Sequence, residues 1–496
     1  MSMIKKLAGE TAIYGTSSIL SRLLNYMILT PYLTRTFAEA EYGVVSILYT
    51  YAAILIILFT YRMETAFFRF GSRDGQLDKA FSTASFSLIF STIAFSLLIW
   101  IGINPISEWL HFSAHPEYIL TVLGMIGLDT LVAIPFARLR LENRPMLFAA
   151  TKTLQIIFNI IFIFLFLKVL PGLYENGHAW AGWFYRAENR IGDLFLANLL
   201  ANGIILLILS PVYLRIRWVF DPVLWKTMLK YAGPLIIVGF AAVVNQLIAL
   251  PLLEHLLPGD LQQNRAQTGI FSAASKLAVL MNLFTQAFNY AAEPFFFRHA
   301  QESDSREIYA QVGYAFSLVG SVVFLGISLF LEIVKYFLGP DLRGGLGVVP
   351  ILLMAYLFLG LYYNFSIWYK LADRTRYGAY ISLGGVVITL LINFIFVPMP
   401  AVGYYAAAWA AFFCYFFMAT ASYLSGRSFY PINYPLRRMG RSIALAGALY
   451  ILASGLSSNI YPNASLFFKL SINGLVLLTY IGYLWKYEGK MIRQLF

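Results

Sequence analysis

Apolar residues occur along this chain in long runs separated by short polar segments, and the pattern repeats from one end to the other. Each run has about 20 residues, which is enough to cross about 30 Å of hydrocarbon as a helix. Single apolar and polar residues do not alternate over any long stretch, so the runs predict helices and not strands. We therefore expect an all-α integral membrane protein with about fourteen transmembrane helices.

The expected spans are short enough to be placed individually. They are 11–34, 43–61, 80–103, 117–137, 146–170, 193–214, 227–256, 268–297, 309–331, 348–370, 379–397, 403–424, 440–460 and 464–485. The longest connecting segment, 171–192, has room for little more than a surface helix. Pro31, Gly233, Pro234 and Pro251 interrupt the first and seventh spans, which indicates moving elements or a binding site, although proline is also frequent in membrane helices generally.

Composition agrees with a membrane location, since 59% of residues are hydrophobic, 12% are charged and the mean hydropathy is +0.70. The net charge of +12 needs no nucleic acid to explain it. If the chain begins in the cytoplasm, most Lys and Arg fall in cytoplasmic segments, as the positive-inside rule requires. Both termini are then cytoplasmic.

Metal and nucleotide chemistry receive no support from the sequence. The single cysteine, Cys414, lies within a span, so the chain forms no internal disulfide. The five histidines do not pair at metal-ligand spacing, and no Gly-rich phosphate loop occurs. We expect no metal, no cofactor and no ATP-driven transport by this chain alone.

Two parts of the chain resemble each other. Span two opens with GVVS at 43–46 and span eight with GIFS at 269–272. Near the far ends, residues 64–69 and 293–298 carry Glu, Phe and Arg at the same relative places. Because six spans separate the copies, both have the same orientation, as in a parallel repeat about an axis along the membrane normal. The alternative is a chance similarity of aromatic-rich helix ends.

The repeat predicts the domain organisation. Two pseudo-symmetric six-helix lobes, 1–214 and 227–425, would surround a central cavity, and a C-terminal helix pair, 440–485, would follow them.

Several motifs resemble those of a known superfamily. The segments SRLL at 21–24, LTRTF at 33–37 and EYG at 41–43 resemble the opening of the multidrug/oligosaccharidyl-lipid/polysaccharide (MOP) exporter superfamily. METAFFRF at 63–70 and AAEPFFF at 291–297 look like segments of its polysaccharide-biosynthesis and lipopolysaccharide O-antigen flippase-like members.

This resemblance implies two six-helix bundles that work by alternating access on a substrate of glycan, diphosphate and polyprenyl chain. In the related lipid II flippases a final helix pair forms a groove for the lipid tail, and 440–485 fits that role. Those flippases carry a further Arg-Asp pair just after the Ser-Arg motif. Asn25, Tyr26 and Met27 stand there in this chain, which argues against lipid II itself.

Two cations lie within expected spans. Arg22 lies about 16 Å along span one, at 1.5 Å per residue, where an unpartnered cation costs at least about 2.5–3.5 kcal/mol. It is a candidate ligand for the substrate diphosphate, or else a structural Arg that donates to carbonyls of a neighbouring helix. Lys276 in span eight is a second candidate, unless its stem reaches outward to the membrane surface.

Each of the other polar residues within the spans allows two interpretations. Asp129 is a candidate for binding a coupling cation or proton, or it is a counter-ion to Arg22. Asn245 and Gln246 in span seven are candidates for substrate binding, or they join neighbouring helices by hydrogen bonds.

Glu64, Arg69, Glu293 and Arg298 are expected at the inner ends of spans two and eight. Residues five apart on a helix do not share a face, so each Glu can seek a partner on another element. We expect Glu64 to meet Arg298, or Glu293 to meet Arg69, as a cytoplasmic gate. The alternative is that the Arg residues are ordinary positive-inside anchors and the Glu residues offset them.

These observations favour a flippase over a cation-coupled multidrug antiporter of the same superfamily, since span one has an Arg and no acid. A membrane glycosyltransferase or polymerase would need acids in substantial outer loops, so we expect no catalytic residue. The expected partners are a polyprenyl-diphosphate-linked glycan, membrane lipid and a glycan polymerase, but no nucleic acid. The expected setting is the bacterial cytoplasmic (inner) membrane, with the chain working as a monomer.

Overall fold

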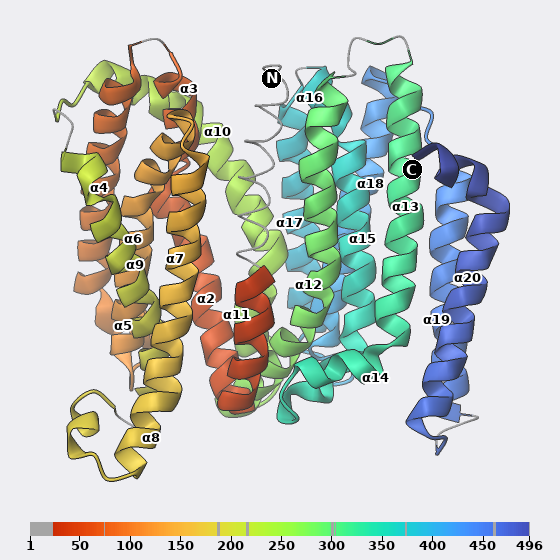
Figure 1. Cartoon of the computed structure of the whole chain (residues 1–496), viewed down its shortest axis with the longest axis horizontal. Coiled ribbons are helices and arrows are strands. Elements are labelled where there is room, and N and C mark those ends of the chain that lie inside the picture. The colour runs from red at the N-terminus through yellow and green to blue at the C-terminus, as the bar shows by residue number, and fades with distance from the viewer. Residues whose placement is uncertain are drawn as a thin grey trace. The chain divides into compact units, whose positions relative to one another are not determined.

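The computed structural model describes residues 23–73, 75–185, 189–214, 218–298, 302, 304–372, 374–459 and 463–495, without the side chains of 291, 293, 294, 297, 298, 458, 459 and 490–495. All regular structure in this part of the chain is helical (Figure 1). It holds 13 helical segments long and apolar enough to cross a membrane. The expected span 11–34 begins outside the described residues, and residues 23–36 are helical. The prediction of a polytopic all-α membrane protein is confirmed.

The described residues form two compact units. The first comprises residues up to Thr36 together with Val44–Val244. Its helices are α2 (Glu39–Thr60), α3 (Met63–Gly71), α4 (Leu77–Ile101), α5 (Ile103–Trp109), α6 (Pro116–Leu141), α7 (Pro145–Phe164), α8 (Leu170–Glu175), α9 (Arg190–Leu214) and α10 (Pro222–Leu247). Residues 39–43 of α2 and 245–247 of α10 belong to the second unit.

The second unit comprises Phe37–Gly43 and the residues from Asn245 onward. Its helices are α11 (Ala249–Leu256), α12 (Leu261–Arg298), α13 (Ser305–Leu329), α14 (Leu331–Val334), α15 (Val349–Phe365), α16 (Ile367–Leu371), α17 (Arg376–Phe396), α18 (Tyr405–Phe429), α19 (Leu436–Asn459) and α20 (Leu466–Leu495). α15 packs against α12, α13 and α18, and α17 packs on α18. The C-terminal pair, α19 and α20, packs against α13.

The first unit extends past residue 214 because α10 shares its core. Met228 and Ala232 of α10 are fully buried in one apolar cluster with Phe67 of α3 and Phe81 of α4. Within this unit α6 packs against α4 and α9, and α7 packs on α9. The lobe boundaries drawn from the repeat stay a prediction, since a repeat counts spans whereas the units reflect packing.

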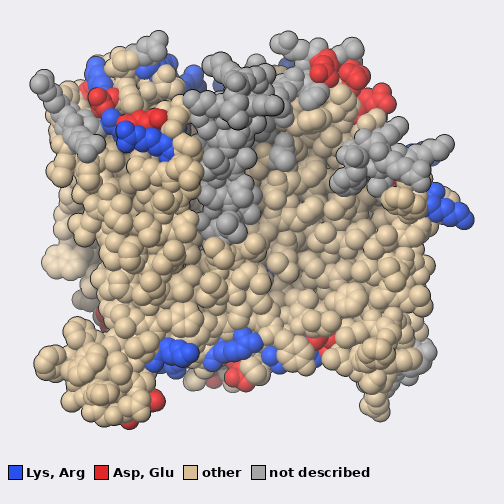
Figure 2. Space-filling model, in the orientation of Figure 1, with Lys and Arg blue, Asp and Glu red and all other residues tan. Residues whose placement is uncertain are grey.

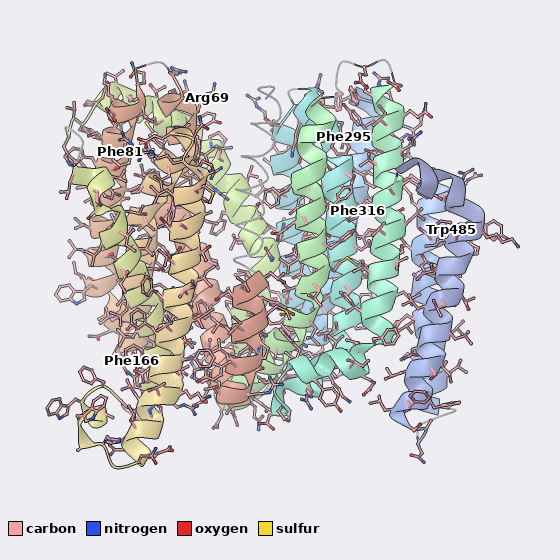
Figure 3. All side chains as sticks on the ribbon, viewed as in Figure 1. Arg69, Phe81, Phe166, Phe295, Phe316 and Trp485 are labelled. Atoms are coloured by element: carbon pink, nitrogen blue, oxygen red, sulfur yellow. The ribbon has the colours of Figure 1, made fainter. Side chains whose placement is uncertain are left out.

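Charged and apolar side chains are distributed as expected for a membrane protein. In each unit the charged residues gather at the two ends of the helices, on the face shown in Figure 2. Phe81 and Phe316 are buried inside their units, whereas Trp485 on α20 is exposed (Figure 3). Many other large apolar side chains, including Phe90, Ile101 and Leu478, are also exposed. Such exposure suits contact with lipid.

Two breaks divide longer helical stretches of the chain. The seventh expected span divides at Ile248, between α10 and α11, three residues before Pro251, so the expected interruption is confirmed there. α10 runs on through Gly233 and Pro234, where an interruption was wrongly expected. The other break, at Tyr61 and Arg62, falls at the end of the expected span 43–61 and separates α2 from α3. Both residues have positive φ, and neither is a glycine that would signal the break.

The loop before α10 is held to α4 by an ion pair. The carboxylate of Asp221 lies 2.5 Å from the Lys79 ammonium and accepts hydrogen bonds from the backbone N–H groups of Val223 and Leu224. These contacts, chiefly the hydrogen bond from Lys79, hold the pKa of Asp221 below its ordinary value. Asp221 thereby caps the N-terminus of α10.

In the second unit the first glycines of the two repeat copies come together. A Cβ added at Gly43 would overlap the carbonyl oxygen of Arg265 and lie 3.2 Å from the nitrogen of Gly269. A Cβ added at Gly269 would overlap the carbonyl oxygen of Glu39. The first turns of α2 and α12 therefore cross at a distance that only glycine permits. Elsewhere in this unit Cys414 is fully buried on α18, with its sulfur 3.8 Å from that of Met418.

Candidate functional site

A polar cavity of about 380 Å³ lies inside the first unit, near the middle of its helices. α2, α6, α7 and α9 contribute to its wall, as does the helix at 23–36. Its polar lining consists mainly of carboxamides, together with one carboxylate and one phenol. The lining residues are Asn25, Tyr49, Ala52, Ala53, Ile56, Met125, Ile126, Asp129, Gln155, Ile156, Asn159, Asn198 and Asn202.

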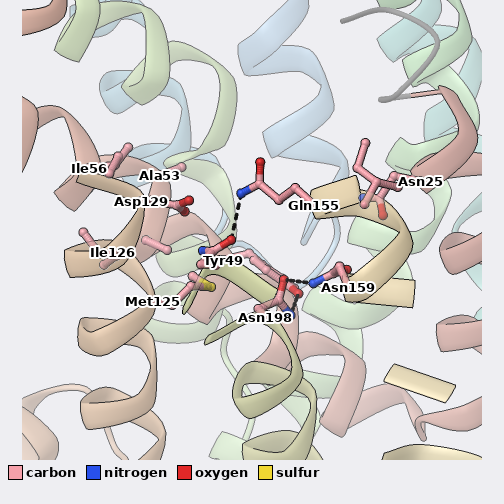
Figure 4. Close-up of a pocket in the computed structure, with 13 residues that line it drawn as sticks. Asn25, Tyr49, Ala53, Ile56, Met125, Ile126, Asp129, Gln155, Asn159 and Asn198 are labelled. Atoms are coloured by element: carbon pink, nitrogen blue, oxygen red, sulfur yellow. Dashed lines mark hydrogen bonds between the residues drawn. The ribbon is translucent and has the colours of Figure 1, made fainter. Parts of the chain in front are cut away.

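Carboxamides one turn apart on two helices form a ladder across this cavity (Figure 4). Gln155 Nε2 of α7 donates to Asn202 Oδ1 of α9 at 2.8 Å. One turn further along, Asn159 Nδ2 donates to Asn198 Oδ1, also at 2.8 Å. Asn198 Nδ2 in turn donates to the hydroxyl of Tyr49 at 3.0 Å. Gln155 and Asn159 are four residues apart on α7, and Asn198 and Asn202 are four residues apart on α9, so each helix presents its two carboxamides on one face. The two helices therefore meet along a row of hydrogen-bonded side chains.

The ladder also bonds a cation. Lys152 Nζ donates to Gln155 Oε1 at 3.1 Å, and Gln155 in turn donates to Asn202. Successive hydrogen bonds of this kind strengthen one another. Lys152 also lies 4.0 Å from the centre of the Phe136 ring. Asp129 is the one acid among the described residues that line the cavity.

Of the polar residues in this cavity, Asp129 was predicted from the sequence and the carboxamides were not. A usable signal was present, because Gln155 and Asn159, and again Asn198 and Asn202, are carboxamides one turn apart in mostly apolar spans. Such spacing puts hydrogen-bonding groups on one side of a membrane helix, where a partner helix or a polar cavity must satisfy them.

An apolar groove of about 660 Å³ lies in the second unit, walled by α15, α18 and α19. Phe358 and Phe412 line one part of it, and Ile443, Gly447 and Ile451 line another. Of its lining side chains, only Thr420 and Tyr423 carry a polar atom other than sulfur. The first helix of the C-terminal pair thus forms one wall of a long apolar cavity.

The predicted substrate-binding residues have different environments. Arg22 lies outside the described residues. Lys276 is half-buried on α12 of the second unit. Asn245 is buried, and its Nδ2 donates to the Ser382 carbonyl at 3.1 Å, so its amide serves the interhelical alternative. Gln246 beside it is exposed.

The predicted gate residues of the first unit lie on α3, beyond the break after α2. Glu64 is half-buried and its Oε1 is 4.0 Å from Arg62 Nη1. Arg69 is exposed, with its guanidinium carbon 4.4 Å from the centre of the Tyr231 ring on α10. Glu293 and Arg298 lie on α12, and their side chains are outside the described part of the chain. The gate stays a prediction.

Comparison with known proteins identifies the fold. No protein-family model and no curated protein matches the chain. Among solved structures, the inward closed conformation of the lipid II flippase MurJ is similar, with 13% identity, a TM-score of 0.71, and 95% of this chain and 98% of the flippase covered. An outward-facing multidrug resistance MATE family transporter of the MOP superfamily is similar at 14% identity, with a TM-score of 0.57 and 88% and 96% covered.

A mutant of the Vibrio cholerae MATE transporter VcmN gives 13% identity, a TM-score of 0.55, and 86% and 98% covered. The chain has the fold of the MOP exporter superfamily. The fold that the motif resemblance implied is therefore confirmed, and the similar structures are a flippase and multidrug transporters. This fold agrees with the 13 segments of the described residues that are long and apolar enough to cross a membrane.

Proposed function

We propose that this protein is a flippase that moves a polyprenyl-diphosphate-linked oligosaccharide across the bacterial cytoplasmic membrane by alternating access, for cell-surface polysaccharide synthesis. The observation that carries this proposal is the apolar groove between α15, α18 and α19. A polyprenyl chain has no reason to leave hydrocarbon while its glycan crosses the membrane, so a flippase for such a lipid benefits from an apolar furrow beside its transport path. A substrate without a lipid tail needs none.

The cations suit the middle part of such a substrate. A diphosphate is best held by guanidinium and ammonium groups, and Arg22 and Lys276 lie within spans one and eight. Similarity to the lipid II flippase also extends over more of this chain than similarity to the MATE transporters does. Lipid II itself is not the proposed cargo, because Asn25, Tyr26 and Met27 replace the charged pair of the lipid II flippases.

Complementation tests the proposal. In a strain that lacks its own glycan flippase and makes the matching lipid-linked glycan, the chain should restore surface polysaccharide. Arg22→Ala should abolish export at normal protein levels, because the diphosphate loses a bidentate partner. Arg35→Ala is the matched control, since Arg35 is exposed near the end of the helix at 23–36 and donates to the Pro31 carbonyl at 2.7 Å. Normal export by the Arg22→Ala variant would contradict the diphosphate role.

The proposed membrane orientation can be tested independently. With both termini in the cytoplasm, reporter domains fused after residue 175 and after residue 496 should lie on opposite sides of the membrane. Two reporters on the same side would mean that the helix count is wrong by an odd number.

A multidrug antiporter is the second candidate, and the similarity to MATE transporters favours it. In that case Asp129 would bind the coupling cation or proton. Cells or proteoliposomes containing the protein would then expel a cationic dye under an ion gradient, and Asp129→Asn would stop them. Dye efflux without any glycan export would reverse the order of the two proposals.

A further inference from the structure

The lining of the carboxamide cavity in the first unit suits neither a diphosphate nor a lipid tail. Lys152 at its wall is already bonded to Gln155, and its only described acid would repel phosphate. A polyprenyl chain would leave the amide and carboxyl groups of the lining unpaired. The cavity therefore fits a different part of the proposed substrate.

We propose that this cavity binds one sugar ring of the glycan through hydrogen bonds to its hydroxyl groups. This inference rests on the proposed function, because the sugar belongs to the flippase substrate. A volume of about 380 Å³ is at the low end for ligand sites, which run from about 300 to 1,000 Å³. It accommodates a single ring and not a whole oligosaccharide.

The cavity supplies acceptors for hydroxyl protons. The side-chain oxygen Oδ1 of Asn25 is buried at the cavity wall and has no hydrogen-bond partner among the described residues. Buried acceptors of this kind are rare unless a ligand or water satisfies them. Asp129 also lines the cavity, and an ionised carboxylate has about four acceptor positions. Sugar hydroxyls can therefore donate to both residues.

The cavity also supplies donors. The Tyr49 oxygen accepts a hydrogen bond from Asn198, which leaves the phenolic proton to donate into the cavity. Gln155 and Asn159 each use one amide N–H in the ladder, so each has a second for a ligand. Acceptors and donors placed a few ångströms apart suit hydroxyl groups, which do both.

The ladder makes this site rigid and selective. Its two cross-helix hydrogen bonds fix the amide orientations before the ligand arrives, so little side-chain freedom is lost on binding. The apolar wall, which includes Ala53, Ile56 and Ile126, matches the C–H face of a sugar ring. A site built to bond hydroxyl groups rejects ligands that lack them, since its polar groups are then left unpaired.

A metal cation fits the same groups less well. The side-chain oxygens of Gln155, Asn198 and Asn202 already accept hydrogen bonds from Lys152, Asn159 and Gln155. Asp129 would be the only charged ligand among the described lining residues, and the Lys152 ammonium is bonded to Gln155 of the same wall. A hard cation prefers several oxygens and no neighbouring ammonium.

The test measures sugar binding by the full-length protein in lipid nanodiscs. Free glucose, galactose and N-acetylglucosamine serve as probes in saturation-transfer difference NMR, and sodium and inorganic diphosphate are titrated separately. Wild type should bind at least one sugar. Asn159→Leu and Asn202→Leu should weaken this binding roughly tenfold or more, as expected for lost hydrogen bonds in a buried site. Asn473→Leu is the matched control, because Asn473 donates to the Leu329 carbonyl in the second unit.

Tyr49→Phe keeps the ring and removes the proton donor, so it tests the site even if the ladder variants fold poorly. It should also weaken sugar binding, with thermal stability close to wild type. Wild type that binds none of the sugars, or Tyr49→Phe and ladder variants that bind them as wild type does, would overturn the inference. So would sodium binding that the Asn202→Leu variant loses while sugar binding persists.

The two proposals fail in different ways. If wild type restores glycan export but the cavity variants bind sugar and export glycan normally, the sugar site is wrong and the flippase stands. If wild type binds sugars through the cavity but exports no glycan, the sugar site stands and the flippase proposal is wrong.

Discussion

The crossing of α2 and α12 offers the sharpest test of the packing. Alanine at position 43 would place its Cβ against the Arg265 carbonyl, 2.9 Å from the carbonyl carbon and overlapping the oxygen, whereas ordinary contacts begin at 3.4 Å. Relieving the overlap with the oxygen requires the two backbones to part by at least about 1 Å, and neither clashing atom belongs to a side chain that could rotate away. Overpacking of this kind costs about 1–3 kcal/mol.

Gly269→Ala makes the reciprocal clash with the Glu39 carbonyl, so it should destabilise by a similar amount. The double variant should cost less than the two single variants together, because the first methyl group already separates the helices that the second would separate. Equilibrium denaturation in mixed detergent micelles, followed by tryptophan fluorescence, would give the three free energies of unfolding.

Gly474→Ala is the matched control on α20. No heavy atom outside its own helix lies within 4 Å of a Cβ built there, so alanine should be neutral or stabilise the helix by up to about 1 kcal/mol. If Gly43→Ala is as stable as Gly474→Ala, or if the double variant is strictly additive, the close crossing is wrong.

Three further outcomes are expected. For the gate, Glu64→Arg should impair glycan export and adding Arg298→Glu should restore a good part of it; a double variant no better than the single would refute the pairing. For the groove, Gly447→Phe should reduce export at normal protein levels because the ring fills space reserved for lipid, whereas Gly474→Phe should not. For pH, the folded-state pKa of Asp221 is lowered, so its stabilising contribution is present above the unfolded value of about 3.9 and is lost as pH falls below it. The melting temperature of wild type should therefore fall more steeply than that of Asp221→Asn as the pH drops below about 4.

The sequence predicted the spans well because each must present about 20 apolar residues to lipid, whatever it packs against. It did not predict that a separate helix, α3, follows the span expected at 43–61, since Tyr61 and Arg62 adopt positive φ without glycine and owe that conformation to tertiary packing. One such contact is visible, because the Arg62 guanidinium lies against Gly239 of α10.

The residues of the candidate sites were likewise predicted only in part. Charges within spans were recognisable singly, because the membrane makes each one costly. Asn245 shows the limit, since its residue type permits both substrate contact and interhelical bonding, and only the structure shows that its buried amide donates to Ser382. The carboxamide cavity depends on which faces of α7 and α9 meet, and spacing within one helix does not reveal the partner helix.

The chemistry of Cys414 makes the protein convenient for labelling. It is the only thiol of the chain, and it is fully buried against Met418, where a bulky maleimide or nitroxide reagent has no access. A cysteine introduced at an exposed position would thus carry a probe with little background, without first removing the native one. Pairs of such probes, one in each unit, would follow the proposed transport cycle by spin-label distances or fluorescence in the otherwise unaltered protein.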